Sequence, residues 1–294
     1  MPSAVGERGM PNLLPPPAFW LNRGILGGFG LLLPALIFLG IFLVVPLSVL
    51  FLRSVTDPTV GLENYIALLG DSSYARVLSN TFTVAALVTA ISLVIGFPVA
   101  WLLAILPSRQ ARWLFAVILL SMWTNLLART YGWMVLLQNT GVINRTLMGL
   151  GLVDAPLHLI NNLTAVTIGM TYIMLPFVIL PLYATISAID PVIMQAAAIC
   201  GAPPASVFGR VLLPLAWRGI GSASLMVFAM ALGYFITPAL LGGSANMMVA
   251  EMIAEYVQTL LQWGLGSAAA FILLAVTLGL YALYVRVFGL TQRI

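Results

Sequence analysis

Six long runs of apolar residues alternate with shorter polar segments along the chain. The runs cover Leu31 to Phe51, Phe82 to Leu106, Trp113 to Leu137, Leu163 to Ala184, Gly219 to Leu241 and Gly266 to Val287. Each has roughly the 20 residues that an α-helix needs to cross a hydrocarbon layer. Lipid offers the backbone no hydrogen-bond partners, so helices are the simplest structures that such runs can form there. The pattern predicts an all-α, polytopic membrane protein with six transmembrane helices.

The remaining sequence predicts a short tail and one interrupted segment. The Gly- and Pro-rich residues 1–23 are expected to be disordered, and residues 24–294 to form a single transmembrane domain. Within residues 190–216, Asp190 suits a helix N-cap with a proline following it. Gly201 suits the left-handed residue that ends such a helix, and two prolines then prevent a straight continuation. We predict a helix, a sharp bend and a second helix, each of roughly ten residues and too short to span a bilayer. Such a segment is expected to dock on another protein.

Composition supports the membrane interpretation and excludes several activities. The chain is 62% hydrophobic and 7% charged, whereas soluble domains average about 25% charged residues. All twelve basic residues are arginines, so a phosphate loop of the GxxxxGK[ST] type cannot be present. The single Cys200 excludes an intrachain disulfide, and the single His158 lies in a polar loop where we expect it to face solvent. A membrane-embedded enzyme is disfavoured, because the runs lack a nucleophile with its base and lack metal ligands.

The arginines predict the orientation of the chain. One face holds only Arg53, Arg76 and Arg145, together with six of the eight acidic residues. The other face holds Arg8, Arg23, Arg109, Arg112, Arg210, Arg218, Arg286 and Arg293. By the positive-inside rule, both termini and residues 190–216 are cytoplasmic. The same rule accounts for the net charge of +4 without invoking nucleic acid.

The interrupted segment resembles the EAA loop of ABC importer permeases. That loop reads Glu-Ala-Ala, three residues, Gly, nine residues, then Ile, any residue and Leu-Pro. Here the matching residues are Gln195, Ala196, Ala197, Gly201, Val211, Leu213 and Pro214. The spacing agrees throughout and the loop precedes the penultimate run, as in the family. Gln195 replaces the acid and Val211 replaces Ile, so an ion pair at position 195 is not expected.

Further elements resemble the spermidine/putrescine permeases in particular. Arg129-Thr130-Tyr131-Gly132-Trp133 is similar to that group's Arg-x-Tyr-x-Trp element. Residues 175–183 are similar to its Leu-Pro-rich fourth span, and residues 233–243 to its fifth. Permeases for ferric ion, thiamine, opines and phosphonates share parts of these elements, so these solutes remain alternatives to a polyamine.

The resemblance implies a type I ABC importer permease fold and a set of partners. Expected partners are ABC ATPase subunits, a second homologous permease, a periplasmic substrate-binding protein and the lipid bilayer. The location implied is the bacterial inner membrane. No cofactor is expected in this chain, since the ATPase would use the ATP and Mg²⁺. We further hypothesise that part of a helix face carrying Phe208, Val211 and Leu212 inserts into a groove on the ATPase, with Gly201 supplying the bend.

Candidate pathway residues follow from the third and fifth runs. Arg129 is the one charged residue well inside a run, and burying it in lipid costs ~2.5–3.5 kcal/mol on a translocon scale. It is therefore expected to face a partner or a wet cavity, either as a structural residue or as a gate. The candidate pathway set is Arg129, Tyr131, Trp133, Tyr234 and Thr237.

Acidic residues that could attract a cation are found only outside the runs. Glu251 and Glu255 lie four apart on one face of a predicted short helix, where they either form a solvated face or draw a cation toward the pore. A stand-alone secondary transporter is the less favoured alternative, because it usually shows acids within its spans or an internal repeat. Any acid needed for a cationic solute is expected to come from the partner permease.

Overall fold

The computed structural model describes residues 25–289, and every regular element in that range is a helix. The chain divides into two compact units, at Leu52 and Arg53. The first unit holds α1 (Ile25–Leu39), the π-helical turn η2 (Gly40–Val44) and the start of α2 (Val45–Thr56). These elements include a 25-residue apolar helix, Leu32–Thr56, that is long enough to cross a membrane. The tail predicted for residues 1–23 lies outside the described residues.

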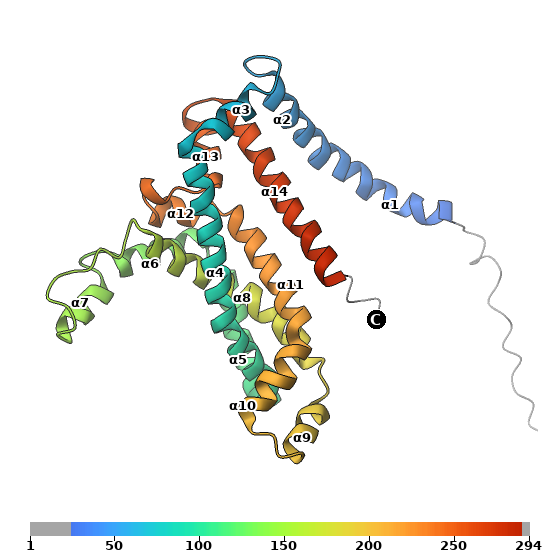
Figure 1. The fold of residues 1–294 in the computed structure, drawn as a ribbon, viewed down its shortest axis with the longest axis vertical. Helices are drawn as coiled ribbons and strands as arrows, with labels where there is room; N and C mark the ends of the chain where they lie inside the picture. The colour runs from blue at the N-terminus through green and yellow to red at the C-terminus, as the bar shows by residue number, and fades with distance from the viewer. Residues whose placement is uncertain (1–24, 290–294) are drawn as a thin grey trace, which may run out of the picture. The chain divides into compact units, whose positions relative to one another are not determined.

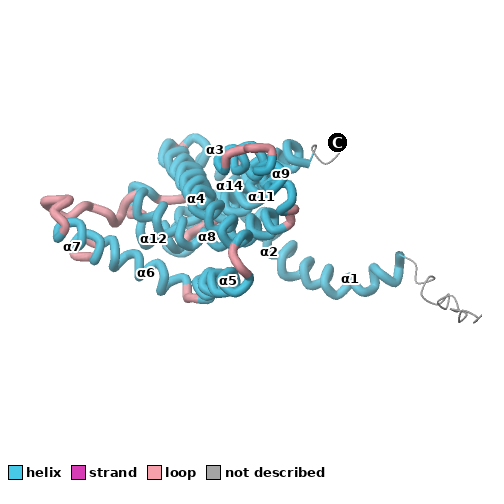
Figure 2. Tube along the Cα trace, turned by 90° about the horizontal axis from the view of Figure 1, so that it is seen from below, coloured by secondary structure: helices cyan, strands magenta, loops and turns pink. Residues whose placement is uncertain are grey.

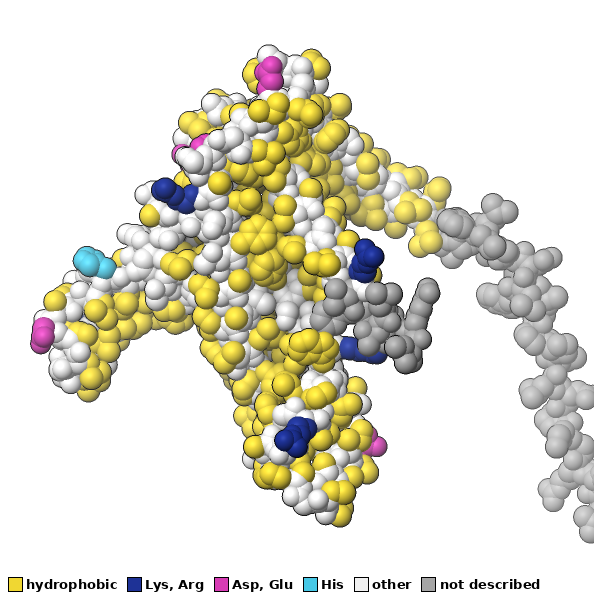
Figure 3. Space-filling view, in the orientation of Figure 1, with side chains coloured by type: hydrophobic (Ala, Val, Ile, Leu, Met, Phe, Trp, Pro, Cys, Tyr) yellow, Lys and Arg dark blue, Asp and Glu magenta, His cyan; other side chains and the backbone are white. Residues whose placement is uncertain are grey.

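Three long helices form the core of the second unit. They are α4 (Ser72–Ile105), α8 (Leu163–Ser187) and α11 (Leu213–Leu232). Figures 1 and 2 show α8 and α11 lying against α4, and α14 (Trp263–Gly289) joins them beside α11. Side chains on the facing surfaces, such as Val88, Met174 and Val227, are completely buried. Hydrophobic side chains are spread along the visible flank of this bundle, where charged ones are few (Figure 3).

Five helices in the described range are long and apolar enough to span a membrane. They are Leu32–Thr56, Ser72–Ile105, Leu163–Ser187, Pro204–Leu232 and Trp263–Arg286. The third predicted span is the exception, because α5 (Ser108–Trp123) and α6 (Leu126–Leu137) meet at a sharp bend. The angle is 95° when α6 is taken together with the following α7 (Val142–Gly149), and the count reaches six if this bent pair is one span. The prediction of one continuous helix over residues 113–137 was wrong, while the predicted number of six spans holds if the bent pair is one span.

The break between α5 and α6 has a local cause. Asn125 accepts hydrogen bonds through its side chain from the backbone N–H groups of Leu127 (2.8 Å) and Ala128 (3.3 Å). An N-cap of this kind starts a new helix, since it satisfies amides that otherwise lack partners. The polar pair Thr124-Asn125 stood inside the apolar run and was a readable signal for this break.

The fifth predicted run is also divided. Helix α11 ends at Leu232, and after three residues the short α12 (Ile236–Leu241) begins. A single helix over residues 219–241 was therefore a wrong expectation. The turn η4 (Ser244–Asn246), α13 (Val249–Ala254) and the π-helical turn η5 (Glu255–Thr259) follow α12.

The interrupted segment has the predicted bend but only one free-standing helix. Asp190 caps α9 (Pro191–Ile199), and its Oδ1 accepts from the Val192 N–H at 2.9 Å. Gly201 has the expected left-handed backbone, with a φ of 82°. The second piece begins as α10 (Pro204–Val207) and continues through the π-helical turn η3 (Phe208–Leu212) into α11. It is therefore the end of a 29-residue helix and not a separate ten-residue one.

The opposite end of the bundle is also helical. Residues 53–79, which separate the first two predicted runs, contain α3 (Glu63–Gly70) and the first turns of α4. Asp71 caps α4 by accepting from the Ser73 N–H at 2.8 Å. At the same end, Thr81 Oγ1 accepts from the Val249 N–H at 2.9 Å, which holds α13 against α4.

Candidate functional site

Helix α9 presents an unpartnered surface at one end of the bundle (Figure 1). None of its nine residues is buried, and Ile199 is 86% exposed. Val192, Gln195, Ala196 and Ile199 share a face, because positions three and four apart are neighbours on a helix. Within this part of the EAA-like segment, Gln195 and Ala196 are exposed and Ala197 is partly buried. An exposed face with large apolar side chains at both ends is typical of a surface that docks on a protein.

The remaining predicted coupling residues differ in how exposed their side chains are. Leu213 and Pro214 are exposed, and Val211 is partly buried. The ring of Phe208 packs on Phe97 at 5.7 Å and on Trp101 at 5.3 Å between centroids.

Leu212 is completely buried within the chain itself. Phe208 thus anchors η3 to the end of α4, so neither Phe208 nor the buried Leu212 is available for the insertion into a partner that was expected of part of this face. The parts of the segment that remain exposed to a partner are α9 and the residues Leu213 and Pro214. Helical spacing placed Phe208 and Leu212 on one face, but it carried no information about which neighbour that face meets.

Gly201 is required by backbone conformation and not by crowding. A Cβ atom at this position would meet no atom within 4 Å, while the φ of 82° lies where L-residues are strained. The bend between α9 and α10 therefore depends on the absence of a side chain.

Four of the five predicted pathway residues lie where α6, α8 and α12 meet. Arg129 on α6 lies close enough to the Tyr234 hydroxyl to interact with it electrostatically, and the Thr237 side chain lies beside the same hydroxyl. Trp133, one turn after Arg129, packs edge-on against Tyr172 of α8 with ring centroids 5.9 Å apart. Tyr131 is 51% exposed and is not part of this cluster.

Thr130 belongs to this cluster and was not predicted. Its hydroxyl is buried and lies 3.2 Å from the Thr237 hydroxyl, which links α6 to α12. The residue stands inside the Arg-x-Tyr-x-Trp element, but nothing in the sequence pairs it with a position 107 residues away.

The Arg129 guanidinium is incompletely satisfied. Its Nε atom is buried and has no hydrogen-bond partner in the described part of the chain. A buried donor left unpaired costs about 1–3 kcal/mol, and more for a charged group. The contacts of Arg129 within the described part of the chain therefore leave one buried donor unpaired.

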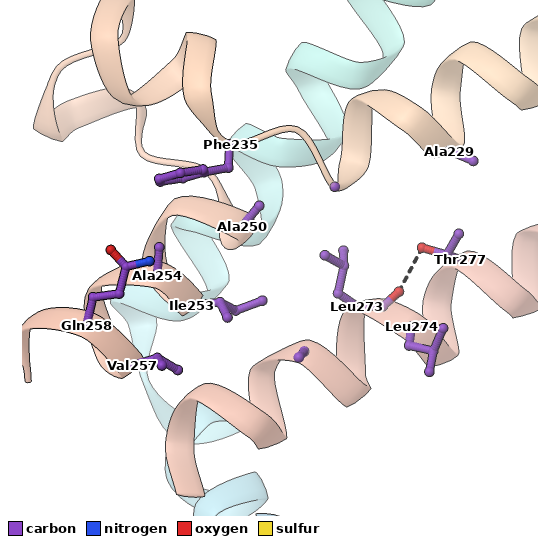
Figure 4. A pocket seen from close by; sticks show the side chains of 12 residues that line it. Ala229, Phe235, Ala250, Ile253, Ala254, Val257, Gln258, Leu273, Leu274 and Thr277 are labelled. Atoms are coloured by element: carbon purple, nitrogen blue, oxygen red, sulfur yellow. Dashed lines mark hydrogen bonds between the residues drawn. The ribbon is translucent and has the colours of Figure 1, made fainter. Parts of the chain in front are cut away.

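A separate apolar cleft lies between α11, α13, η5 and α14, with a volume of about 550 Å³. Phe235 from the loop before α12, Ile253 from α13 and Leu273 from α14 border it, and Gln258 lies at its edge (Figure 4). Besides Gln258, the polar side chain that lines the cleft is that of Thr277, whose hydroxyl donates a hydrogen bond to the Leu273 carbonyl at 2.8 Å. No charged residue lines the cleft, so it is suited to apolar contacts and not to holding an ion.

The two predicted outer acids differ in environment. Glu255 is exposed, whereas Glu251 is partly buried with an Oε2 atom that has no hydrogen-bond partner among the described residues. Burial raises the pKa of Glu251 above its ordinary value, a hydrogen bond from the Met248 backbone partly offsets this, and Glu255 raises the pKa further. Helix α13 lies outside the candidate spans.

The raised pKa of Glu251 predicts a pH-dependent stability. The folded protein holds this proton over a wider pH range than the unfolded chain, so stability falls as pH rises from the ordinary glutamate pKa through the raised one. Glu251→Gln should remove this loss and increase the thermal midpoint of the purified protein above that window. Glu255→Gln should produce a smaller change in the same direction. Thermal unfolding of the three proteins between pH 4 and 8 in steps of about one unit measures this; an unchanged profile in Glu251→Gln would contradict it.

Other potential ligands do not gather into a site. His158 and Cys200 are both exposed. Among the described residues, no three His, Cys, Asp or Glu side chains come together as a metal site would require.

Sequence comparisons identify relatives across most of the chain. The family described as binding-protein-dependent transport system inner membrane component matches residues 96–289. The spermidine/putrescine transport system permease protein PotB of Escherichia coli K12 is 36% identical over 222 residues, covering 76% of this chain and 80% of PotB. The inner membrane ABC transporter permease protein YdcU of the same organism is 35% identical and covers 92% of each chain.

Solved structures show the same fold. A chain of a bacterial ABC transporter that imports the acidic polysaccharide alginate matches with a TM-score of 0.67, at 18% identity, over 91% of this chain and 98% of that one. The same kind of transporter in complex with a periplasmic protein bound to an alginate pentasaccharide matches with a TM-score of 0.71, at 19% identity, over 91% and 96%. At these identities the likeness establishes the all-helical permease architecture.

Proposed function

The chain belongs to the family of binding-protein-dependent transport system inner membrane components, and from this premise we propose that it is the permease subunit of an ATP-driven importer for polyamines. It is a multi-pass inner-membrane permease with the ABC importer fold and, as a transport subunit, not an enzyme. The observation that carries the polyamine assignment is the 36% identity to PotB over three quarters of the chain. The more distant 2-aminoethylphosphonate permease PhnU of Salmonella typhimurium, putative by its own description, is 24% identical, which favours the polyamine over the phosphonate alternative.

In the proposed assembly, other chains hydrolyse ATP, complete the pathway and deliver the solute. An ATPase subunit docks on the α9 face and uses the ATP and Mg²⁺, since this sequence has no lysine for a phosphate loop. A second permease completes the pathway and a periplasmic protein delivers the solute; the alginate transporter bound to its periplasmic protein supports the latter role. Both termini and α9 are cytoplasmic in this arrangement, in keeping with the arginine distribution. Docking at α9 relies on shape and apolar contact, because Gln195 carries no charge.

Transport by the assembled complex tests the proposal. This chain, its ATPase, the second permease and the binding protein are co-purified and reconstituted in vesicles. We expect ATP-dependent, saturable uptake of radiolabelled spermidine that unlabelled putrescine inhibits. ATP-driven uptake of phosphonate or ferric ion without spermidine uptake would overturn the polyamine assignment, while the assignment as a permease subunit would stand. Active uptake by this chain alone would refute the importer mechanism.

The same complex tests the α9 docking face. Ile199→Asp places a charge where a partner is proposed to bury an apolar side chain, and losing such an anchor costs about 2 kcal/mol or more. We expect at least a roughly tenfold drop in co-purified ATPase. Val60→Asp is the matched control, because Val60 is also 86% exposed but precedes α3 at the other end of the bundle. Equal ATPase recovery with both variants would remove α9 from the interface.

A further inference from the structure

The outward face of α5 carries two arginines followed by apolar side chains. The opposite face packs on the chain, with Ile118 buried and the Phe115 ring 5.8 Å from that of Tyr183 on α8. The outward face is exposed along its whole length, and Figure 2 shows α5 at the edge of the bundle. Its members recur every three or four residues and therefore lie on one side of the helix. They are Arg109, Arg112, Trp113, Ala116, Val117, Leu120 and Trp123.

The two arginines share a cavity at the start of the helix. A volume of about 380 Å³ is lined there by Arg109, Arg112, Trp113 and Ala116. Arg112 Nε donates to the Ser108 carbonyl at 3.2 Å, and no carboxylate in the described part of the chain pairs with either arginine. Two neighbouring cations without a counter-charge suit this cavity to an anion.

The apolar part of the outward face has the length of one membrane leaflet. Trp113 and Trp123 are ten positions apart, which corresponds to about 15 Å of helix. One leaflet contributes about half of a ~30 Å hydrocarbon core. Val117 and Leu120 between the tryptophans are 62% and 69% exposed. The candidate span bends sharply after Trp123, so this straight face ends at the same depth.

A charged head joined to an apolar tail of this length is the form of a phospholipid. The arginine fork binds two phosphate oxygens at once, and tryptophan is enriched at the level of lipid headgroups. A phosphate between Arg109 and Arg112 would place the attached acyl chain beside Val117 and Leu120. The positions of the charges and of the apolar side chains thus select the same ligand.

Other occupants match only part of the outward face. Residues 25–52 of this chain contain no Asp or Glu, so they offer no anion to the arginines. An ATPase docked at α9 would lie outside the bilayer, where it could reach the arginines but not Leu120. A free phosphate would likewise leave the apolar side chains uncovered. A helix of the second permease would need a carboxylate at headgroup level, and the experiment below tests for it.

We propose that the outward face of α5 binds an anionic phospholipid, with Arg109 and Arg112 holding its phosphate and an acyl chain lying along Val117 and Leu120. In the orientation proposed above, this lipid belongs to the cytoplasmic leaflet. The site goes beyond the transport function and does not depend on which solute is carried. The lipid supplies the counter-charge that the chain itself does not offer to these two arginines.

Lipid binding to the purified complex tests the site. Phosphatidylglycerol and phosphatidylcholine are titrated into the detergent-solubilised complex, and bound lipids are counted by native mass spectrometry. Arg109→Gln/Arg112→Gln should weaken phosphatidylglycerol binding at least about tenfold and leave phosphatidylcholine binding unchanged. Arg109→Lys/Arg112→Lys keeps the charges but loses the fork, and should retain an intermediate affinity. Arg145→Gln/Arg286→Gln is the matched control, because it removes two exposed arginines outside the cavity, and should bind as the wild type does.

Brominated acyl chains locate the tail of the lipid. Bromine quenches tryptophan emission at short range, so brominated phosphatidylglycerol should quench the wild type more than brominated phosphatidylcholine does. This excess should fall in Trp113→Phe and in the double glutamine variant. Trp217→Phe is the control, since Trp217 is also exposed but belongs to α11, and should retain the excess.

Several results would overturn the site. Equal affinity for the two lipids, or unchanged phosphatidylglycerol binding in the double glutamine variant, would show that the arginines hold no lipid phosphate. Inorganic phosphate that displaces phosphatidylglycerol at equal concentration would indicate a site for a free anion. Loss of the second permease or the ATPase from the double glutamine variant, with lipid binding unchanged, would assign the arginines to a protein interface. All of these measurements are made without solute, so they stand whether or not the complex transports a polyamine.

Discussion

Gly201→Val is expected to lower ATP-driven uptake by at least tenfold while ATP hydrolysis continues. Gly201 holds a φ of 82° at the bend between α9 and α10. An L-residue pays roughly 1–2 kcal/mol in the left-handed region, and a β-branched one is a still poorer fit. The chain would relax by changing the bend, so α9 would no longer be held in one direction relative to α11. Uptake and ATPase activity of the reconstituted complex, measured together, report this loss of coupling.

Two further variants isolate the backbone effect. Gly201→Asn should retain most of the uptake, because Asn tolerates the left-handed conformation better than other non-glycine residues. Gly209→Val in the same segment should also be mild, since a Cβ there meets no atom within 4 Å and the backbone is helical. Wild-type coupling in Gly201→Val would show that the bend does not transmit the motion of the ATPase.

Gly96→Leu should be the most damaging change to the bundle itself. A Cβ at position 96 of α4 would lie 2.8 Å from Val178 Cγ1 of α8, and 3.5 Å from Ile179 Cγ1. Both neighbours are held in the core, so the two helices must separate. Overpacking of this kind costs typically 1–3 kcal/mol, and a whole leucine should reach or exceed about 3 kcal/mol. The thermal midpoint and the yield of monodisperse protein should both fall.

The control for crowding is a leucine at an open glycine. Gly279 of α14 is exposed, and a Cβ there meets nothing within 4 Å. Gly279→Leu should therefore leave the thermal midpoint close to that of the wild type. Equal destabilisation by the two leucines would mean that close approach of α4 and α8 at Gly96 is not what holds the bundle together.

The membrane helices and the bend at Gly201 were accessible without coordinates. Apolar runs of spanning length, an aspartate followed by proline and a glycine ten residues later act through local chemistry and through the surrounding lipid. The breaks were partly accessible: Asn125 was a cap signal inside the third run. Only the hydrogen bonds to Leu127 and Ala128 show that it ends one helix and begins another.

The coupling segment and the Arg129 cluster depended on packing between distant parts of the chain. Periodicity placed Phe208 and Leu212 on one face, but the neighbour of that face is α4, which comes about a hundred residues earlier. In the same way, the hydroxyls of Thr130 and Thr237 meet across 107 positions.

Composition and local spacing thus establish that this chain is helical, lies in a membrane and carries a capped, bent segment, because each of these follows from near neighbours and solvent. The tertiary structure decides which side chains turn inward, that α9 is left exposed for a partner, and that Arg129 lies near the Tyr234 hydroxyl with its Nε buried and unpaired among the described residues. Those outcomes depend on how separate helices pack, and the packing energy is shared among contacts that no single stretch of sequence contains.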